Sequence, residues 1–187
     1  TKHHAPLVPL FEFLKITARA DIKSDLLQEL ERQKHLLEAL RKNPNVDETT
    51  LNTALGNIRS TFREMLDLPG KVGEHLREND WLMSIKQRMA IPGGCCVFDL
   101  PFYHYWLNLD TEKRHQDFKE WLGPFQPVRN AFEIVLYLLR KSGKTIKLTA
   151  SQGVFQQTGA EYAAHMLRLN LSDELPCIPE ISANKYA

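Results

Sequence analysis

Residues 91–109, IPGGCCVFDLPFYHYWLNL, constrain the fold more than any other part of this chain. Proline cannot continue the hydrogen-bond ladder of a helix, and two consecutive glycines accept backbone angles that side chains forbid, so residues 92–94 must end any helix before them. The apolar run at residues 95–98 is bounded by turn residues and predicts a short buried strand. Pro101 suits the first turn of a new, aromatic helix. The segment is therefore predicted to join two domains.

Before this joint the sequence predicts helices. Leucines recur at helical spacing through residues 26–42, after Asp21 or Ser24 as the N-cap. A second apolar stripe at residues 51–66 follows Asp47, which can cap it. The short connection between the two makes them an antiparallel hairpin. Shorter helices are expected at residues 8–20, 74–77 and 81–89.

After the joint, two patterns follow one another. A helix capped by residues 110–111 is predicted at residues 112–122. Apolar residues cover most of the circumference of the next helix, residues 128–139, which predicts a helix buried on several sides. From Lys144 onward the apolar period changes to two, which predicts antiparallel strands. The strand candidates are residues 145–149, 154–155 and 166–171, and a further strand formed by residues 178–181 and 185–187.

These elements predict an α+β fold: a mainly helical domain with a helix hairpin and a buried central helix, beside a small antiparallel β-sheet domain. The helical domain is expected to comprise residues 1–92 and 100–142. The β-strand domain is expected to be discontinuous, with residues 93–99 and 143–187, and to be completed by segments outside this chain.

Composition excludes several classes of protein. No apolar run approaches the ~18 residues of a membrane span, and three cysteines, two of them adjacent, do not make a secreted disulfide framework. A reducing cytoplasm is the natural compartment. There is no C-x-x-C or H-x-x-x-H spacing for a metal and no phosphate-binding glycine motif, so no cofactor is expected.

A thiol nucleophile is the one catalytic alternative. An imidazole at His104 could lower the pKa of a thiol at Cys95 or Cys96 and accept its proton. However, adjacent strand residues point to opposite faces, so at most one thiol could meet the ring, and free cysteines are usually small buried apolar residues. Packing is the better interpretation, and no enzymatic activity is expected.

Charge is distributed unevenly although the net charge is only +1. No Asp or Glu occurs between Glu133 and Glu161, whereas that interval contains Arg140, Lys141, Lys144 and Lys147. These cations could complement the carboxyl end of a helix in solvent, or they could form a surface that faces an anion. A nucleic-acid-binding module on residues 140–147 is a weaker alternative, as is a purely structural helical dimer.

Three separated motifs carry a resemblance to a known family. They are QRMAIPGGCCVFDLPFYHYWL at residues 87–107, DLLQELERQ at residues 25–33 and LRLNLS at residues 167–172. The chain resembles the Z-ring-associated protein D family of bacterial cell-division factors over essentially its whole length. Members of that family extend beyond both ends of these 187 residues, so the chain is expected to be incomplete.

The resemblance implies a function. Members of the family form symmetric homodimers that bind the carboxy-terminal tail of the tubulin-like GTPase FtsZ, so that one dimer bridges and bundles filaments of the Z-ring at midcell. Arg19, which precedes the motif at residues 25–33, and His104, which lies inside the motif at residues 87–107, are carried over as tail-binding residues. Lys147, Lys185 and Arg140 are added because of their charge and their position near the predicted strands. No membrane partner is expected.

Overall fold

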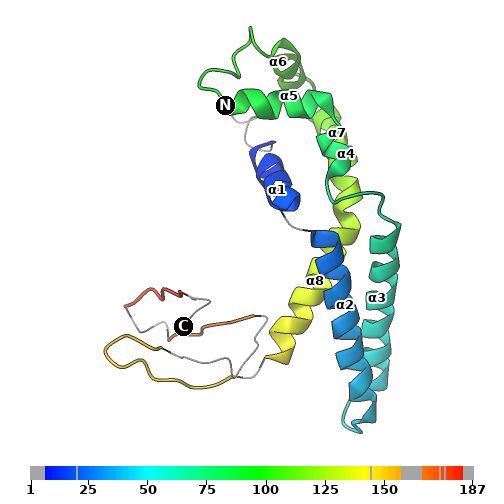
Figure 1. Ribbon diagram of the computed structural model, residues 1–187, viewed down its shortest axis with the longest axis vertical. Coiled ribbons are helices and arrows are strands. Elements are labelled where there is room, and N and C mark those ends of the chain that lie inside the picture. Colours follow the sequence, from blue (N-terminus) through cyan, green and yellow to red (C-terminus); the bar gives the residue numbers. More distant parts are fainter. Residues whose placement is uncertain are drawn as a thin grey trace. The chain divides into compact units, whose positions relative to one another are not determined.

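The computed structural model describes residues 7–19, 21–143, 145–156, 166–172, 174 and 176–182. The chain forms two units, Thr1–Val135 and Leu136–Ala187, and the division falls inside its last described helix. Figure 1 labels the helices that follow.

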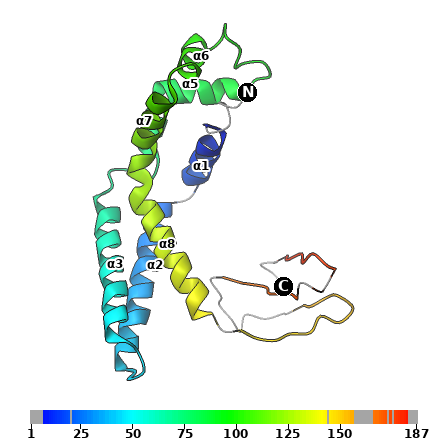
Figure 2. The same cartoon turned by 180° about the vertical axis from the view of Figure 1, so that it is seen from behind.

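A helical hairpin is the longest feature of the first unit. α2 (Ile22–Ala39) continues into the 3₁₀ turn η1 (Leu40–Lys42) and is followed by α3 (Glu48–Asp67), and the two helices lie side by side in Figures 1 and 2. The Asp21 side chain accepts a hydrogen bond from the Ser24 amide at 3.2 Å, and Asp47 accepts one from the Thr50 amide at 2.8 Å. Both aspartates satisfy amides that a helix leaves without an internal partner. The predicted hairpin and its caps are confirmed.

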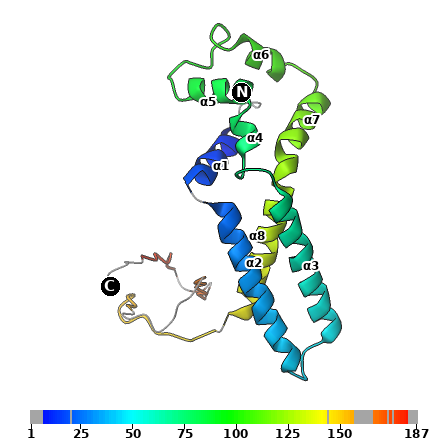
Figure 3. The ribbon, with the colours of Figure 1, turned by 45° about the vertical axis from the view of Figure 1, so that its right-hand side comes forward.

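A second contact region joins α1 (Leu7–Arg19) to the one-turn helix α4 (Glu74–Arg77). The Arg77 guanidinium donates to the buried Thr17 hydroxyl at 2.8 Å, and a Cβ atom placed on Gly73 would lie only 2.7 Å from a methyl carbon of Leu14. Figure 3 shows the two helices next to each other. The absence of a side chain at Gly73 allows this close approach, and its φ of +79° suits glycine.

Three further helices pack through aromatic side chains. α5 (Asp80–Met89), α6 (Pro101–Leu107) and α7 (Thr111–Leu122) contribute rings whose centroids lie 5.2 to 6.5 Å apart. Pro101 occupies the first turn of α6, as predicted. The aromatic cluster consists of Trp81, Tyr103, Trp106, Phe118 and Trp121.

The helix α8 (Gln126–Ser142) follows α7 through the 3₁₀ turn η2 (Gly123–Phe125). Its buried residues are Val128, Ala131 and Val135, which form one stripe, whereas Phe132 is 38% exposed and Tyr137 is 60% exposed. The prediction that this helix is buried on several sides is therefore wrong. Apolar residues do surround the helix, but only those spaced at i, i+3 and i+7 are buried.

The predicted β-sheet domain is also wrong for the described residues, among which there is no strand. Residues 92–95 and 97–99 form turns: the amide of Gly94 donates to Ile91, that of Cys96 to Gly93 and that of Leu100 to Cys96. Gly93 adopts a φ of +76°, which directs the chain into these turns. Local bonds thus occupy backbone groups that a strand would present to a partner.

The described residues after 143 also lack strands. Their sole β-type pairing is a bridge between Ser151 and Val154, closed by a local turn in which Gly153 has a φ of +80°. Residues 145–149 and 166–171 are irregular, and Ile146, Leu148 and Leu169 are exposed. An alternating pattern becomes a strand only where a neighbour completes the hydrogen bonds, and a lone hairpin is marginal in water.

Candidate functional site

His104 lies on α6 and is half-buried. Its Nε2 atom is 2.8 Å from the carbonyl oxygen of Cys95, and its ring centroid is 5.9 Å from that of Tyr103. Because a carbonyl only accepts hydrogen bonds, this nitrogen carries a proton. The imidazole therefore fastens the turn at residues 92–99 to the start of α6.

The thiols near His104 are not arranged as a nucleophile and base. His104 contacts the backbone of Cys95, and the Cys96 sulfur lies 3.1 Å from Asp99 Oδ2. Burial, the neighbouring Cys96 and Asp99 all raise the pKa of the Cys95 thiol. A raised pKa lowers the fraction of reactive thiolate, which is the opposite of what a catalytic cysteine needs.

The other predicted site residues are spread over both units. Arg19 is the last residue of α1, and its side chain lies outside the described part of the chain, as does all of Lys185. Arg140 is exposed near the end of α8, and Lys147 is exposed in the irregular segment that follows. Within their unit, no described residue forms an ion pair with either of these two cations. The tail-binding role of all five residues stays a prediction.

Exposed aromatic side chains around the joint were missed by the sequence interpretation. Phe98 is 96% exposed at the turn, and on α6 Phe102 is 76% and Tyr105 68% exposed. Helical spacing could have revealed the α6 pair: Tyr103 and Trp106 lie on the covered face, so residues one position earlier face away.

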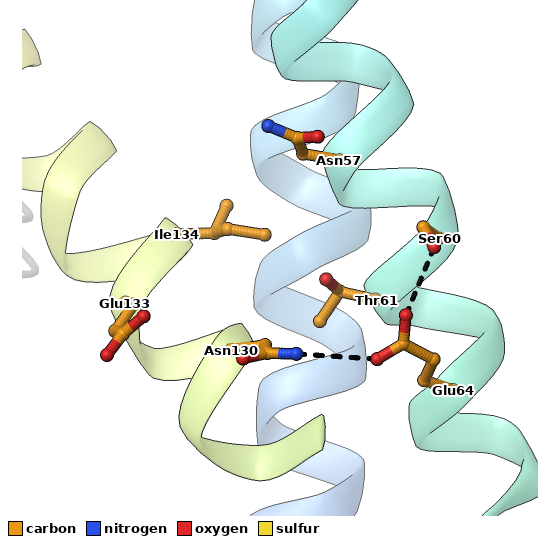
Figure 4. Close-up of a pocket in the computed structure, with 7 residues that line it drawn as sticks. All are labelled: Asn57, Ser60, Thr61, Glu64, Asn130, Glu133 and Ile134. Carbon is orange, nitrogen blue, oxygen red and sulfur yellow. Dashed lines mark hydrogen bonds between the residues drawn. The ribbon is translucent and has the colours of Figure 1, made fainter. Parts of the chain in front are cut away.

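A polar groove between α3 and α8 was also missed. It has a volume of about 300 Å³ and lies wholly within the first unit. Figure 4 shows side chains from both helices projecting toward each other across it. The groove is lined by Asn57, Ser60, Thr61 and Glu64 of α3 and by Asn130, Glu133 and Ile134 of α8.

Glu64 is the centre of the groove's hydrogen bonds. Its Oε1 accepts from the Ser60 hydroxyl at 3.1 Å, and its Oε2 accepts from the Asn130 amide at 3.4 Å, as drawn in Figure 4. Glu133 instead pairs with Arg129 at 2.9 Å. Glu64 therefore has only neutral donors among the described residues.

Other kinds of site find little support in the part of the chain that the structure describes. No three side chains of His, Cys, Asp or Glu gather there as metal ligands. None of the described helices has the length and apolar character needed to span a bilayer.

Comparison with known proteins gives the family. The family model described as ZapD, cell division protein, matches residues 1–187. The chain is 59% identical over 186 residues to the cell division protein ZapD of Nitrosomonas europaea, and the matched region covers 100% of this chain and 71% of that protein. It is 55% identical to ZapD of Nitrosomonas eutropha (100% and 74% covered) and 52% identical to ZapD of Chromobacterium violaceum (99% and 73% covered). The chain therefore belongs to the ZapD family of cell division proteins.

Proposed function

We propose that this cell division protein binds the carboxy-terminal tail of FtsZ and, as a homodimer, cross-links and bundles FtsZ filaments at midcell in the cytoplasm. Family membership over the whole chain supports a role in division. The residues proposed to hold the tail are Arg140 and Lys147, with Arg19, His104 and Lys185 as further candidates.

The observation that carries the proposal is the pair of exposed cations at Arg140 and Lys147. Both lie in a stretch without a single Asp or Glu, and neither is neutralised by a described residue of its unit. Every carboxy-terminal tail ends in a carboxylate, which such cations attract. Next to Lys147, Ile146 is 60% and Leu148 is 59% exposed, so apolar side chains of a tail would find contacts beside the charge.

Sites of this kind are individually weak. Exposed ion pairs contribute about 0.2–1 kcal/mol each, and a tail that becomes ordered on binding loses conformational entropy. Two sites on one dimer compensate for the weak affinity of each site, because a filament presents many tails and the second tail binds to a protein that is already attached to the filament. Bundling then needs bivalence rather than high affinity at one site.

Charge reversal tests the proposal. In the variant Arg140→Glu with Lys147→Glu, two attractions become repulsions, so the affinity for a fluorescent FtsZ tail peptide should fall roughly tenfold or more in anisotropy titrations. Low-speed pelleting of FtsZ filaments with GTP should fall with it. Both assays use the full-length protein.

The matched control is Lys42→Glu with Lys113→Glu, which makes the same change of net charge at two other exposed lysines. It should bind the peptide nearly as well as the unmodified protein. Equal weakening by both variants would show a general effect of net charge, and unchanged binding by the first would place the tail elsewhere.

A further inference from the structure

Two adjacent thiols lie in the turn at residues 92–99 that precedes α6. Cys96 is exposed and Cys95 is half-buried, so the packing role expected from the sequence does not account for Cys96. We infer that the two cysteines are a site of reversible oxidation, at which oxidised glutathione closes a disulfide bond between the neighbouring residues and thereby releases the turn from α6. The inference does not depend on the proposed binding of FtsZ.

The peptide group between the two cysteines holds the turn in place. Its carbonyl oxygen, from Cys95, accepts the hydrogen bond from His104 Nε2 at 2.8 Å, and its N–H, from Cys96, donates to the Gly93 carbonyl at 3.1 Å. A disulfide between adjacent residues closes a ring that contains this same peptide group. Ring closure therefore acts directly on both hydrogen bonds.

Covalent geometry makes such a disulfide strained and labile. Adjacent Cα atoms lie about 3.8 Å apart, whereas the Cα atoms of most disulfides lie about 4.4–6.8 Å apart. The backbone between the two cysteines must therefore adjust as the ring closes. Strained disulfides are easily reduced, which is typical of regulatory disulfides rather than of structural ones.

The exposed thiol reacts first. The Cys96 thiolate attacks one sulfur of oxidised glutathione, which forms a mixed disulfide and releases one glutathione thiolate. The Cys95 thiolate then attacks the Cys96 sulfur, closes the ring and releases the second glutathione. The two cysteine thiols lose two protons and two electrons in total, and oxidised glutathione gains them to become two glutathione molecules. Burial raises the pKa of the Cys95 thiol, but its attack is intramolecular, so proximity offsets the small fraction of thiolate.

The contacts of the reduced form oppose ring closure. The Cys96 thiol donates to Asp99 Oδ2 at 3.1 Å, and the disulfide has no proton to donate there. Any hydrogen bond that oxidation breaks stabilises the two thiols relative to the disulfide, because the two equilibria are linked. Oxidation also frees the segment that carries Phe98, whose side chain is 96% exposed, from its attachment to His104 on α6.

Intact-mass spectrometry tests whether the disulfide forms. The variant Cys177→Ser leaves only the adjacent pair of thiols. After treatment with oxidised glutathione it should lose two hydrogen atoms and retain no glutathione, and dithiothreitol should reverse the change. The further substitution Cys95→Ser removes the second attacking thiol, so that protein should stop at the mixed disulfide on Cys96. If the protein with both cysteines also stopped at the mixed disulfide, or formed disulfides only between molecules, the inference would be overturned.

The NMR signal of His104 Nε2 reports whether the turn is released. This signal should move on oxidation, because the carbonyl that the nitrogen contacts belongs to the disulfide ring. His75 is the matched control, since its Nε2 lies 2.9 Å from the Trp121 carbonyl, outside the turn, and its signal should stay in place. An unchanged His104 signal in fully oxidised protein would show that the disulfide does not act on α6.

Removing the donor at His104 gives a second test of the same linkage. His104→Phe keeps a ring beside Tyr103 but cannot bond to the carbonyl, so the equilibrium constant for forming the disulfide with glutathione should rise roughly three- to tenfold. The control His115→Phe, at an exposed histidine of α7, should leave that constant unchanged. Circular dichroism checks that both variants keep their helices. Equal constants for His104→Phe and the unmodified protein would refute the link between oxidation and the His104 hydrogen bond.

Discussion

Replacing Trp106 with phenylalanine tests how the aromatic cluster holds the first unit together. Trp106 is 6% exposed, and its ring centroid lies 5.6 to 6.2 Å from those of four other aromatic side chains. Its indole Nε1 donates to Asp117 Oδ2 at 2.7 Å, which links α6 to α7. Phenylalanine keeps a ring in place but removes the donor.

The expected cost follows from these contacts. A hydrogen bond to a charged acceptor contributes about 1.5–3 kcal/mol, and the smaller ring leaves a partial void that costs about 1 kcal/mol more. Trp106→Phe should therefore lower the free energy of unfolding by about 2–4 kcal/mol. Asp117→Asn keeps an acceptor without its charge and should cost about 1 kcal/mol.

The double variant distinguishes this hydrogen bond from general packing. Once Trp106 has gone, changing Asp117 should add almost nothing, so the double variant should be about 1 kcal/mol more stable than the sum of the two changes predicts. Urea unfolding followed by circular dichroism at 222 nm measures this without depending on tryptophan fluorescence. The control Tyr105→Phe, at a 68% exposed ring, should change stability by less than about 0.5 kcal/mol. A loss under about 1 kcal/mol for Trp106→Phe, or strict additivity, would refute the reasoning.

Three other measurements follow from the structure. A variant that keeps only Cys95 should be alkylated several times more slowly at pH 8 than one that keeps only the exposed Cys177, since burial raises the pKa of the Cys95 thiol; equal rates by mass spectrometry would contradict this. Burial raises the pKa of Tyr103 from 10.0 to about 12, so the folded state retains the phenol proton that the unfolded state loses between these values. The free energy of unfolding should therefore be highest below pH 10 and should fall by about 1.4 kcal/mol per pH unit as the pH rises toward 12. If the Tyr103→Phe protein showed the same dependence of unfolding free energy on pH, Tyr103 would be excluded as its cause. Gly73→Ala should destabilise by at least about 1–2 kcal/mol in thermal unfolding because of its positive φ and the 2.7 Å approach of Leu14, whereas Gly56→Ala, with open space inside α3, should stabilise by about 0.5–1 kcal/mol; the reverse order would be incompatible with this packing.

The helices could be predicted because their signals are local. Asp21, Asp47 and Asn79 each bond an amide three residues further along, and Pro101 begins α6 without any distant partner. Such short-range hydrogen bonds join residues at fixed spacings, so the sequence alone predicts them. The breaks and the hairpin could be recognised for the same reason.

The strands and the burial of α8 could not be decided in this way. A period of two at residues 145–149 specifies which side chains share a face, but a strand also needs a neighbouring chain to bond with. Likewise, the apolar residues on every side of α8 do not reveal which of them other helices cover. Phe132 is more apolar than Asn130, yet Asn130 is the more covered of the two.

The candidate sites show the same limit. A gap between acidic residues revealed the cations at Arg140 and Lys147 directly from the sequence. The groove could not be predicted from the sequence, because the hydrogen bond between Asn130 and Glu64 joins residues 66 positions apart. Thr61 looks like an ordinary helix residue until α8 is placed beside it.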